Sequence, residues 1–130
     1  MLTPGSEGST FGGYPLASVV GTYAIKVMID AKLAENAKIR GDQLMKNLNN
    51  IKDQFPDKIM EVRGKGLLTA FEMFDEDKLD GHKVSLGLLD RDVYAKETHH
   101  TTVRLAPALT ISSQQIDQLS DAVKDVVSSL

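Results

Sequence analysis

The sequence contains no cysteine. Disulfide bonds, thiolate metal sites and catalysis by a cysteine nucleophile are therefore excluded. The three histidines, His82, His99 and His100, have no spacing with carboxylates that is typical of a metal site. We interpret them as loop residues and expect no metal.

Basic residues are not in surplus. The chain has 15 Lys and Arg against 18 Asp and Glu, which gives a formal net charge of -3. Nucleic-acid-binding proteins normally carry a basic surplus on one face, so we expect no nucleic-acid partner.

Long apolar runs are also missing. No run reaches the length that spans a membrane, and nothing at Met1 resembles a signal or transit peptide. We expect no membrane partner, and the cytosol and the mitochondrial matrix both fit the sequence. A glycine-rich segment so close to Met1 is unusual, and we expect these residues to be a piece of something longer.

At 130 residues and 42 % hydrophobic, the chain is long enough for one domain with a core. The spacing of apolar residues changes from helical to alternating at Ile59. The expected elements are helices at 15–31 and 33–51, strands at 59–63 and 67–74, a short helix at 84–89, strands at 93–96 and 102–105, and a helix after Ser112. This order predicts an α+β fold, with helices packed on a small, mostly antiparallel sheet.

Local signals favour two of these helices and weaken the prediction of a third. Pro15 suits the first position of a helix, where its missing N–H costs nothing, and apolar residues within 16–31 then recur on one face. Ser112 and Gln115 form a capping box before the last helix. Gly41 lies inside the second helix, where glycine costs about 1 kcal/mol relative to alanine.

The segment Gly8–Gly13 could hold a small dianion. Backbone N–H groups in a glycine-rich turn bind phosphate well, and the hydroxyls of Ser9 and Thr10 would add donors. A flexible loop before a helix is the simpler interpretation, because such short motifs are weak alone. The segment is not a P-loop, since no Gly-Lys-Ser/Thr follows, and not a dinucleotide fingerprint, since no strand precedes it.

Arg104 is the single charge in an otherwise apolar strand. It should point to the opposite face from Val103 and Leu105, because side chains alternate along a strand. Arginine is preferred where a carboxylate is bound through two parallel hydrogen bonds. The alternative is an exposed or structurally paired arginine on an edge strand.

A second basic segment, residues 63–67, places Arg63 and Lys65 beside glycines. It could pass for an anion-binding nest. A tight connection between two strands is favoured, because glycine supplies positive φ at such turns. Glu72 and the acids at 75–77 are interpreted as a solvated face, and residues 75–80 as an acidic turn or loop.

Taken in order, five segments resemble the C-terminal part of the class III pyridoxal-phosphate-dependent aminotransferases, most closely those that act on ornithine. They are residues 4–17 (PGSEGSTFGGYPLA), 33–37 (LAENA), 62–68 (VRGKGLL), 95–99 (AKETH) and 103–107 (VRLAP). The resemblance covers essentially the whole chain, and five matched segments are far more specific than one. It favours the phosphate interpretation of Ser9 and Thr10 over the flexible loop.

The resemblance implies the end of the large domain of fold type I at residues 1–30 and the C-terminal small domain at residues 31–130. It implies pyridoxal 5'-phosphate as cofactor and a homodimer in which Ser9 and Thr10 contact the cofactor phosphate of the neighbouring subunit. Arg104 would bind the carboxylate of the amino acid or 2-oxo acid substrate. The implied reaction moves an amino group between L-ornithine and 2-oxoglutarate.

Three positions depart from the family pattern. Glu7 stands where histidine is common, and Ala108 where a second proline is common. Tyr14 replaces an asparagine before Pro15, and losing such an N-cap typically costs about 1 kcal/mol.

The family's chemistry also needs a lysine that bonds to the cofactor, an acid beside the pyridine nitrogen and a stacking aromatic side chain. In the family all three precede the segment matched here, and no lysine of this chain lies in a matching motif. We therefore expect no catalytic residue in this chain and no transaminase activity from it alone. An acetylornithine or 4-aminobutyrate aminotransferase, and a non-catalytic interaction module with the same fold, are the alternatives.

Overall fold

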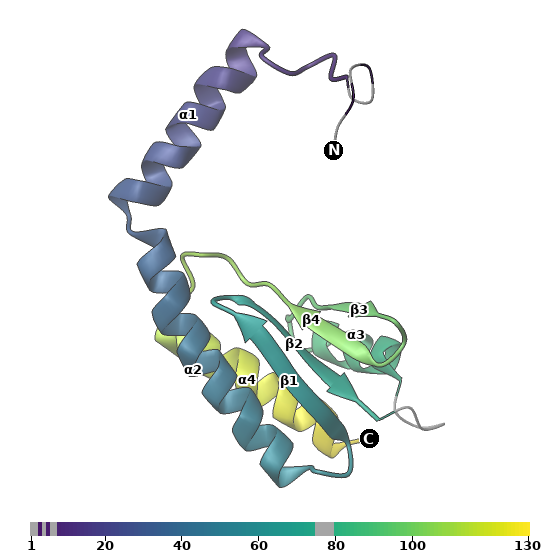
Figure 1. Cartoon of the computed structure of the whole chain (residues 1–130). Helices are drawn as coiled ribbons and strands as arrows, with labels where there is room; N and C mark the ends of the chain where they lie inside the picture. Colours follow the sequence, from purple (N-terminus) through teal and green to yellow (C-terminus); the bar gives the residue numbers. More distant parts are fainter. Residues whose placement is uncertain (1–2, 4, 6–7, 75–79) are drawn as a thin grey trace. The chain divides into compact units, whose positions relative to one another are not determined.

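The computed structural model describes residues 3, 5, 8–74 and 80–130. The elements in chain order are α1 (Pro15–Asp30), α2 (Leu33–Gln54), β1 (Ile59–Lys65), β2 (Leu68–Met73), α3 (Gly81–Leu89), β3 (Lys96–Thr98), β4 (Thr102–Leu105) and α4 (Ser113–Ser128) (Figure 1). The chain divides into two compact units, residues 1–33 and residues 34–130. The predicted α+β class is confirmed.

The first unit contains α1 and the loop before it. Pro15 is the first residue of α1, as predicted, and Tyr14 provides no side-chain cap. No residue of α1 is buried, and Ile25, Met28 and Ile29 are exposed in addition to the predicted apolar face. The prediction of one apolar face is therefore wrong, because apolar side chains lie on several sides of the helix. Such a helix is typical of the core of a larger domain.

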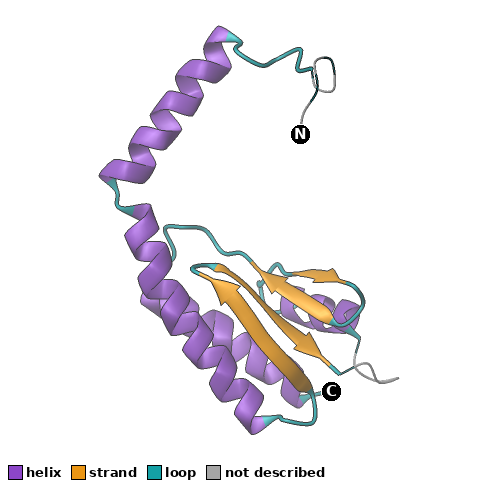
Figure 2. Ribbon diagram, viewed as in Figure 1, coloured by secondary structure: helices purple, strands orange, loops and turns teal. Residues whose placement is uncertain are grey.

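The second unit is built on an antiparallel sheet with the strand order β1-β2-β4-β3. The helices α2, α3 and α4 cover one face of it (Figure 2), and strand residues on that face, such as Phe71 and Val103, are fully buried. The other face carries the exposed strand residues.

The strand predicted at residues 93–96 is wrong in its position, since β3 begins at Lys96. Residues 90–92 form the turn that follows α3, and residues 93–95 lie in no strand. The Val93 N–H donates to the Leu88 carbonyl at 2.9 Å, and Asp92 has a φ of 60°, which is not a strand conformation.

Helices and sheet share one hydrophobic core. Its fully buried side chains are Leu44, Leu48, Ile59, Phe71, Met73, Val84, Leu88, Val103, Leu105, Ile116, Val123 and Val127. The capping box predicted before α4 is confirmed. Ser112 Oγ accepts from the Gln115 N–H at 3.2 Å, and Gln115 Oε1 accepts from the Ser112 N–H at 3.0 Å.

Gly41 is buried in α2 against the turn between β1 and β2. A Cβ at this position would lie 2.3 Å from the carbonyl carbon and oxygen of Gly66. Gly66 has a φ of +57°, as the tight connection predicted for residues 63–67 requires. Because α2 passes directly over this turn, only glycine fits at position 41 without moving the backbone.

Two of the three histidines lie where they were expected. His99 and His100 are in the turn between β3 and β4. His82 lies in α3 instead, because the Asp80 side chain accepts from the His82 N–H and caps the helix at this point. Within the described residues, no group of three or more His, Cys, Asp or Glu could hold a metal ion.

Glu7 and the acidic stretch at residues 75–79 lie outside the described residues. Over the part of the chain that is described, none of the helices is both long and apolar enough to cross a membrane.

Candidate functional site

Ser9 and Thr10 lie in an exposed loop before α1. The loop turns through hydrogen bonds from the Gly12 N–H to the Ser9 carbonyl at 3.4 Å and from the Tyr14 N–H to the Phe11 carbonyl at 3.1 Å. Among the described residues, the hydroxyls and N–H groups of Ser9 and Thr10 have no hydrogen-bond partner. They are therefore available to an external acceptor.

This donor set fits a phosphate group. Phosphate oxygens accept hydrogen bonds from hydroxyls and from backbone N–H groups presented together. The short approach at Gly12, where a Cβ would lie 3.2 Å from Ser9 Cβ and Oγ, keeps the turn tight. Ser9 and Thr10 belong to the first unit and Arg104 to the second.

Arg104 occupies the middle of β4, on the face of the sheet opposite α2, α3 and α4. Its neighbours Val103 and Leu105 are 0 % and 1 % exposed and point into the core, whereas Arg104 is exposed. The register places Ala70 of β2 on one side of it and Lys96 of β3 on the other. The predicted orientation is confirmed.

Arg104 forms no hydrogen bond or ion pair with any described residue. Its neighbour Lys96 lies 3.4 Å from Glu97 Oε1. Glu97 points to the helix side, where His82 Nδ1 lies 3.6 Å from the same oxygen. A hydrogen bond with its own backbone, aided by Lys96 and His82, lowers the pKa of Glu97 and keeps it charged.

Arg63 extends the row of basic side chains across the sheet. Arg63 of β1 lies opposite Ala70 of β2, and Arg104 of β4 lies opposite the same residue from the other side. Its Nη1 donates to Glu72 and, at 2.7 Å, to Glu61, and the hydrogen bond to Glu72 raises the pKa of Arg63. Among the described residues, Arg63 is thus paired with two carboxylates, while Arg104 has no charged partner.

The sequence placed Arg63 at the end of the predicted strand 59–63 and favoured a tight connection over an anion-binding nest for residues 63–67. It did not predict that Arg63 pairs with Glu72 on the same face of the sheet as Arg104. The strand alternation of β1 and β2 could have placed Arg63 and Glu72 on one face. The register between β2 and β4, which pairs residues far apart in sequence, could not be read from the sequence.

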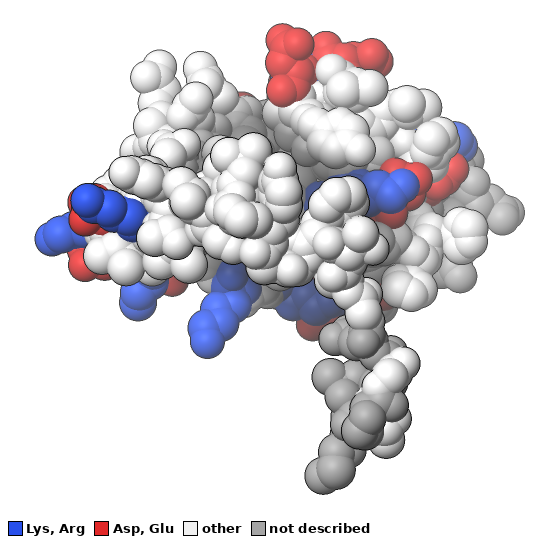
Figure 3. Space-filling view, turned by 90° about the horizontal axis from the view of Figure 1, so that it is seen from above, with Lys and Arg blue, Asp and Glu red and all other residues white. Residues whose placement is uncertain are grey.

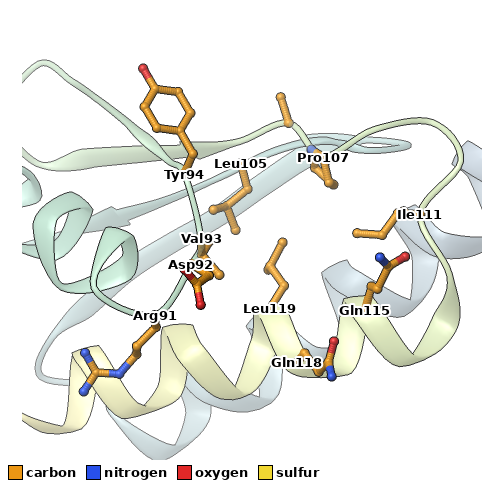
Figure 4. Close-up of a pocket in the computed structure, with 11 residues that line it drawn as sticks. Arg91, Asp92, Val93, Tyr94, Leu105, Pro107, Ile111, Gln115, Gln118 and Leu119 are labelled. Atoms are coloured by element: carbon orange, nitrogen blue, oxygen red, sulfur yellow. The ribbon is translucent and has the colours of Figure 1, made fainter.

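A hollow of about 520 Å³ lies between α4, the end of β4 and the residues before β3 (Figure 4). Leu105 and Leu119 line it together with the amides of Gln115 and Gln118. Leu105 points to the helix side of the sheet and Arg104 to the opposite side. The hollow is therefore separate from the surface around Arg104.

Charges of both signs are interspersed over the surface. The face in Figure 3 shows basic groups beside acidic ones, with broad uncharged areas between them. The near balance of 15 basic and 18 acidic residues agrees with this view.

Comparison with known families establishes the class of protein. The model of the family "Aminotransferase class-III" matches residues 1–127, and the chain belongs to this family. The resemblance inferred from the five segments is confirmed at this level.

Individual relatives are ornithine and acetylornithine aminotransferases. The chain is 44 % identical over 128 residues to the mitochondrial ornithine aminotransferase of Arabidopsis thaliana, covering 97 % of the chain and 27 % of that protein. It matches the structure of Plasmodium falciparum ornithine delta-aminotransferase with 37 % identity and a TM-score of 0.82, over 98 % of the chain and 32 % of that one. It also matches the structure of the acetylornithine aminotransferase of Elizabethkingia anophelis, with 33 % identity and a TM-score of 0.86. This match covers 99 % of the chain and 32 % of that protein. The chain thus spans less than a third of the length of these relatives.

Proposed function

We propose that the chain is the C-terminal part of an ornithine aminotransferase that moves an amino group between L-ornithine and 2-oxoglutarate. The observation that carries the proposal is Arg104, a charged, unpaired side chain on the open face of the sheet. The names of the Arabidopsis and Plasmodium relatives support the choice of ornithine. Residues 1–30 would close the large domain of the complete subunit, and residues 31–130 would form its small domain.

Arg104 would bind the substrate carboxylate. A guanidinium donates two parallel hydrogen bonds to a carboxylate and holds it in one plane. The small side chain of Ala70 on one side leaves room for the ligand, and Lys96 on the other adds positive charge. The substrate's acid group would thus be fixed while its amino or oxo group reacts elsewhere in the complete enzyme.

Ser9 and Thr10 would hold the phosphate of pyridoxal 5'-phosphate bound in the neighbouring subunit of a homodimer. Their hydroxyls and N–H groups are free donors in an exposed loop, which is what a contact across subunits needs. When bound, this cofactor supplies the electron sink on which transamination depends. The residues of this chain would anchor it and would take no proton.

Acetylornithine is the second candidate substrate, because the Elizabethkingia acetylornithine aminotransferase matches the fold as well. The stretch Lys96–His99 before Arg104 favours ornithine within the family pattern. A 4-aminobutyrate aminotransferase and a non-catalytic interaction module have no separate observation in their favour. The Arabidopsis relative is mitochondrial by name, and we propose the mitochondrial matrix or the cytosol for the complete protein.

The test is a comparison of substrates with the complete dimeric protein loaded with pyridoxal 5'-phosphate. We expect a higher kcat/KM for L-ornithine than for N-acetylornithine, with 2-oxoglutarate as acceptor in both reactions. The opposite order would assign the protein to acetylornithine. Absence of transfer from either donor would refute the aminotransferase proposal and favour an interaction module.

A further inference from the structure

Glu72 is an acidic neighbour that could neutralise Arg104. In β2 the residues Phe71 and Met73 point into the core, so Glu72 points to the open face that Arg104 shares. The register sets Glu72 opposite Thr102, two residues before Arg104. Diagonal neighbours of this kind lie about 7–8 Å apart, within reach of long side chains.

Arg63 holds this carboxylate instead. Its Nη1 bonds both Glu72 and Glu61, and its Nη2 lies 3.5 Å from Thr102 Oγ1. The Arg63 side chain therefore starts level with Arg104, since both lie opposite Ala70, and its guanidinium contacts Glu61 of β1, Glu72 of β2 and Thr102 of β4. Among the three charged residues Glu61, Arg63 and Glu72, Glu72 has the least exposed side chain, at 24 % against 44 % for Arg63.

The other charges around Arg104 do not compete for it. Lys96 repels a guanidinium, and Glu97 is engaged with Lys96 on the helix side of the sheet. Lys65, at the end of β1, is also basic. Among the described residues, Glu72 is thus the acid placed to pair with Arg104 if Arg63 were removed.

We propose that Arg63 is a positioning residue: it holds the Glu72 carboxylate away from Arg104 and so keeps Arg104 free for the carboxylate of the substrate. The inference rests on the proposed role of Arg104. A tethered carboxylate competes at an effective concentration of about 1 mM, and typical KM values lie between about 1 μM and 1 mM. For a carboxylate that binds Arg104 with a dissociation constant of about 0.1 mM, this competition multiplies KM by about 1 + 1/0.1, so removing Arg63 should raise KM by about 10-fold.

The first experiment observes the Arg104–Glu72 pair directly in the 130-residue chain. The NMR signal of the Arg104 Nε–Hε group is followed across the pH range in which glutamate titrates, near its usual pKa of about 4.3. In Arg63→Leu we expect this signal to shift with a carboxyl titration. In the parent chain, in Arg63→Lys and in the double variant Arg63→Leu/Glu72→Gln we expect no such shift.

The inference would be overturned if the Arg104 signal in Arg63→Leu did not change with pH. It would also be overturned if the signal still shifted with pH in the double variant. Neither result depends on substrate binding, so neither would refute the proposed role of Arg104 in binding the substrate carboxylate. Urea unfolding of Arg63→Leu, followed by circular dichroism, checks that the sheet remains folded.

The second experiment measures KM for glutamate and for 2-oxoglutarate in the complete enzyme. Arg63→Leu should raise both KM values about 10-fold, and adding Glu72→Gln should restore them. A rise that persists in the double variant would mean that Arg63 only supports the strands, and the inference would fall. Failure of the Arg104 role itself would appear separately, as an unchanged KM in Arg104→Leu.

Discussion

Replacing Gly41 with alanine should destabilise the chain, although alanine is the better helix former. An added Cβ would lie 2.3 Å from the carbonyl carbon and oxygen of Gly66 and 2.6 Å from its Cα. These are backbone atoms, so no side chain can rotate away. Either α2 or the turn between β1 and β2 must move.

The magnitude follows from two opposing effects. Removing glycine from a helix interior gains about 1 kcal/mol. Carbon atoms pack at about 3.5–4.0 Å, so the clash requires a shift of more than about 1 Å between α2 and the turn. Overpacking of a well-packed core costs about 1–3 kcal/mol and occasionally more, and this backbone clash belongs at the upper end. We expect a net loss of about 2 kcal/mol in the free energy of unfolding.

The assay is urea unfolding of the 130-residue chain, followed by far-UV circular dichroism. Gly21→Ala is the matched control, because a Cβ at Gly21 in α1 meets nothing within 4 Å. The control should keep or raise helicity. A Gly41→Ala chain as stable as its parent would show that α2 does not press on Gly66, and the packing described for the second unit would be wrong.

Three further predictions concern the cap, the core and the activity. Ser112→Ala should lower the free energy of unfolding by about 1 kcal/mol in the same urea assay, because the Gln115 N–H loses its acceptor; an unchanged midpoint would contradict the capping box. Thr69→Val should be neutral or stabilising by up to about 1 kcal/mol, because Thr69 Oγ1 is buried without a partner among the described residues; a clear loss would reveal a bonded hydroxyl. The 130-residue chain, mixed with glutamate, pyridoxal phosphate and an aldehyde acceptor, should show no enzyme-level turnover in an assay for 2-oxoglutarate, and turnover would refute the need for residues outside it.

Much of the second unit could be predicted because its signals are local. The alternation in β1, β2 and β4 follows from one buried face, and the capping box at Ser112 needs residues only three apart. The same alternation oriented Arg104 correctly between Val103 and Leu105.

Features that depend on distant contacts could not be predicted. Gly41 looked like a weak point of α2 until its contact with Gly66, 25 residues later in the chain, explained it. The start of β3 was missed because Asp92 and Val93 bond back to the last residues of α3, in the turn that follows the helix, and do not continue as a strand. The pairing of Arg63 with Glu72, beside Arg104 on the sheet, depends on the register of three strands.

The most direct test of the carboxylate site is the KM for glutamate of Arg104→Leu in the complete enzyme. Removing one member of a charged hydrogen-bonded pair costs about 2–5 kcal/mol, so KM should rise at least about 30-fold. The KM of Arg104→Lys should lie between those of the parent and Arg104→Leu, since lysine keeps the charge and loses the two-bond geometry. Arg40→Leu, which removes an arginine of α2 that bonds Gln43, is the control and should leave KM unchanged. An unchanged KM for glutamate in Arg104→Leu would contradict the account.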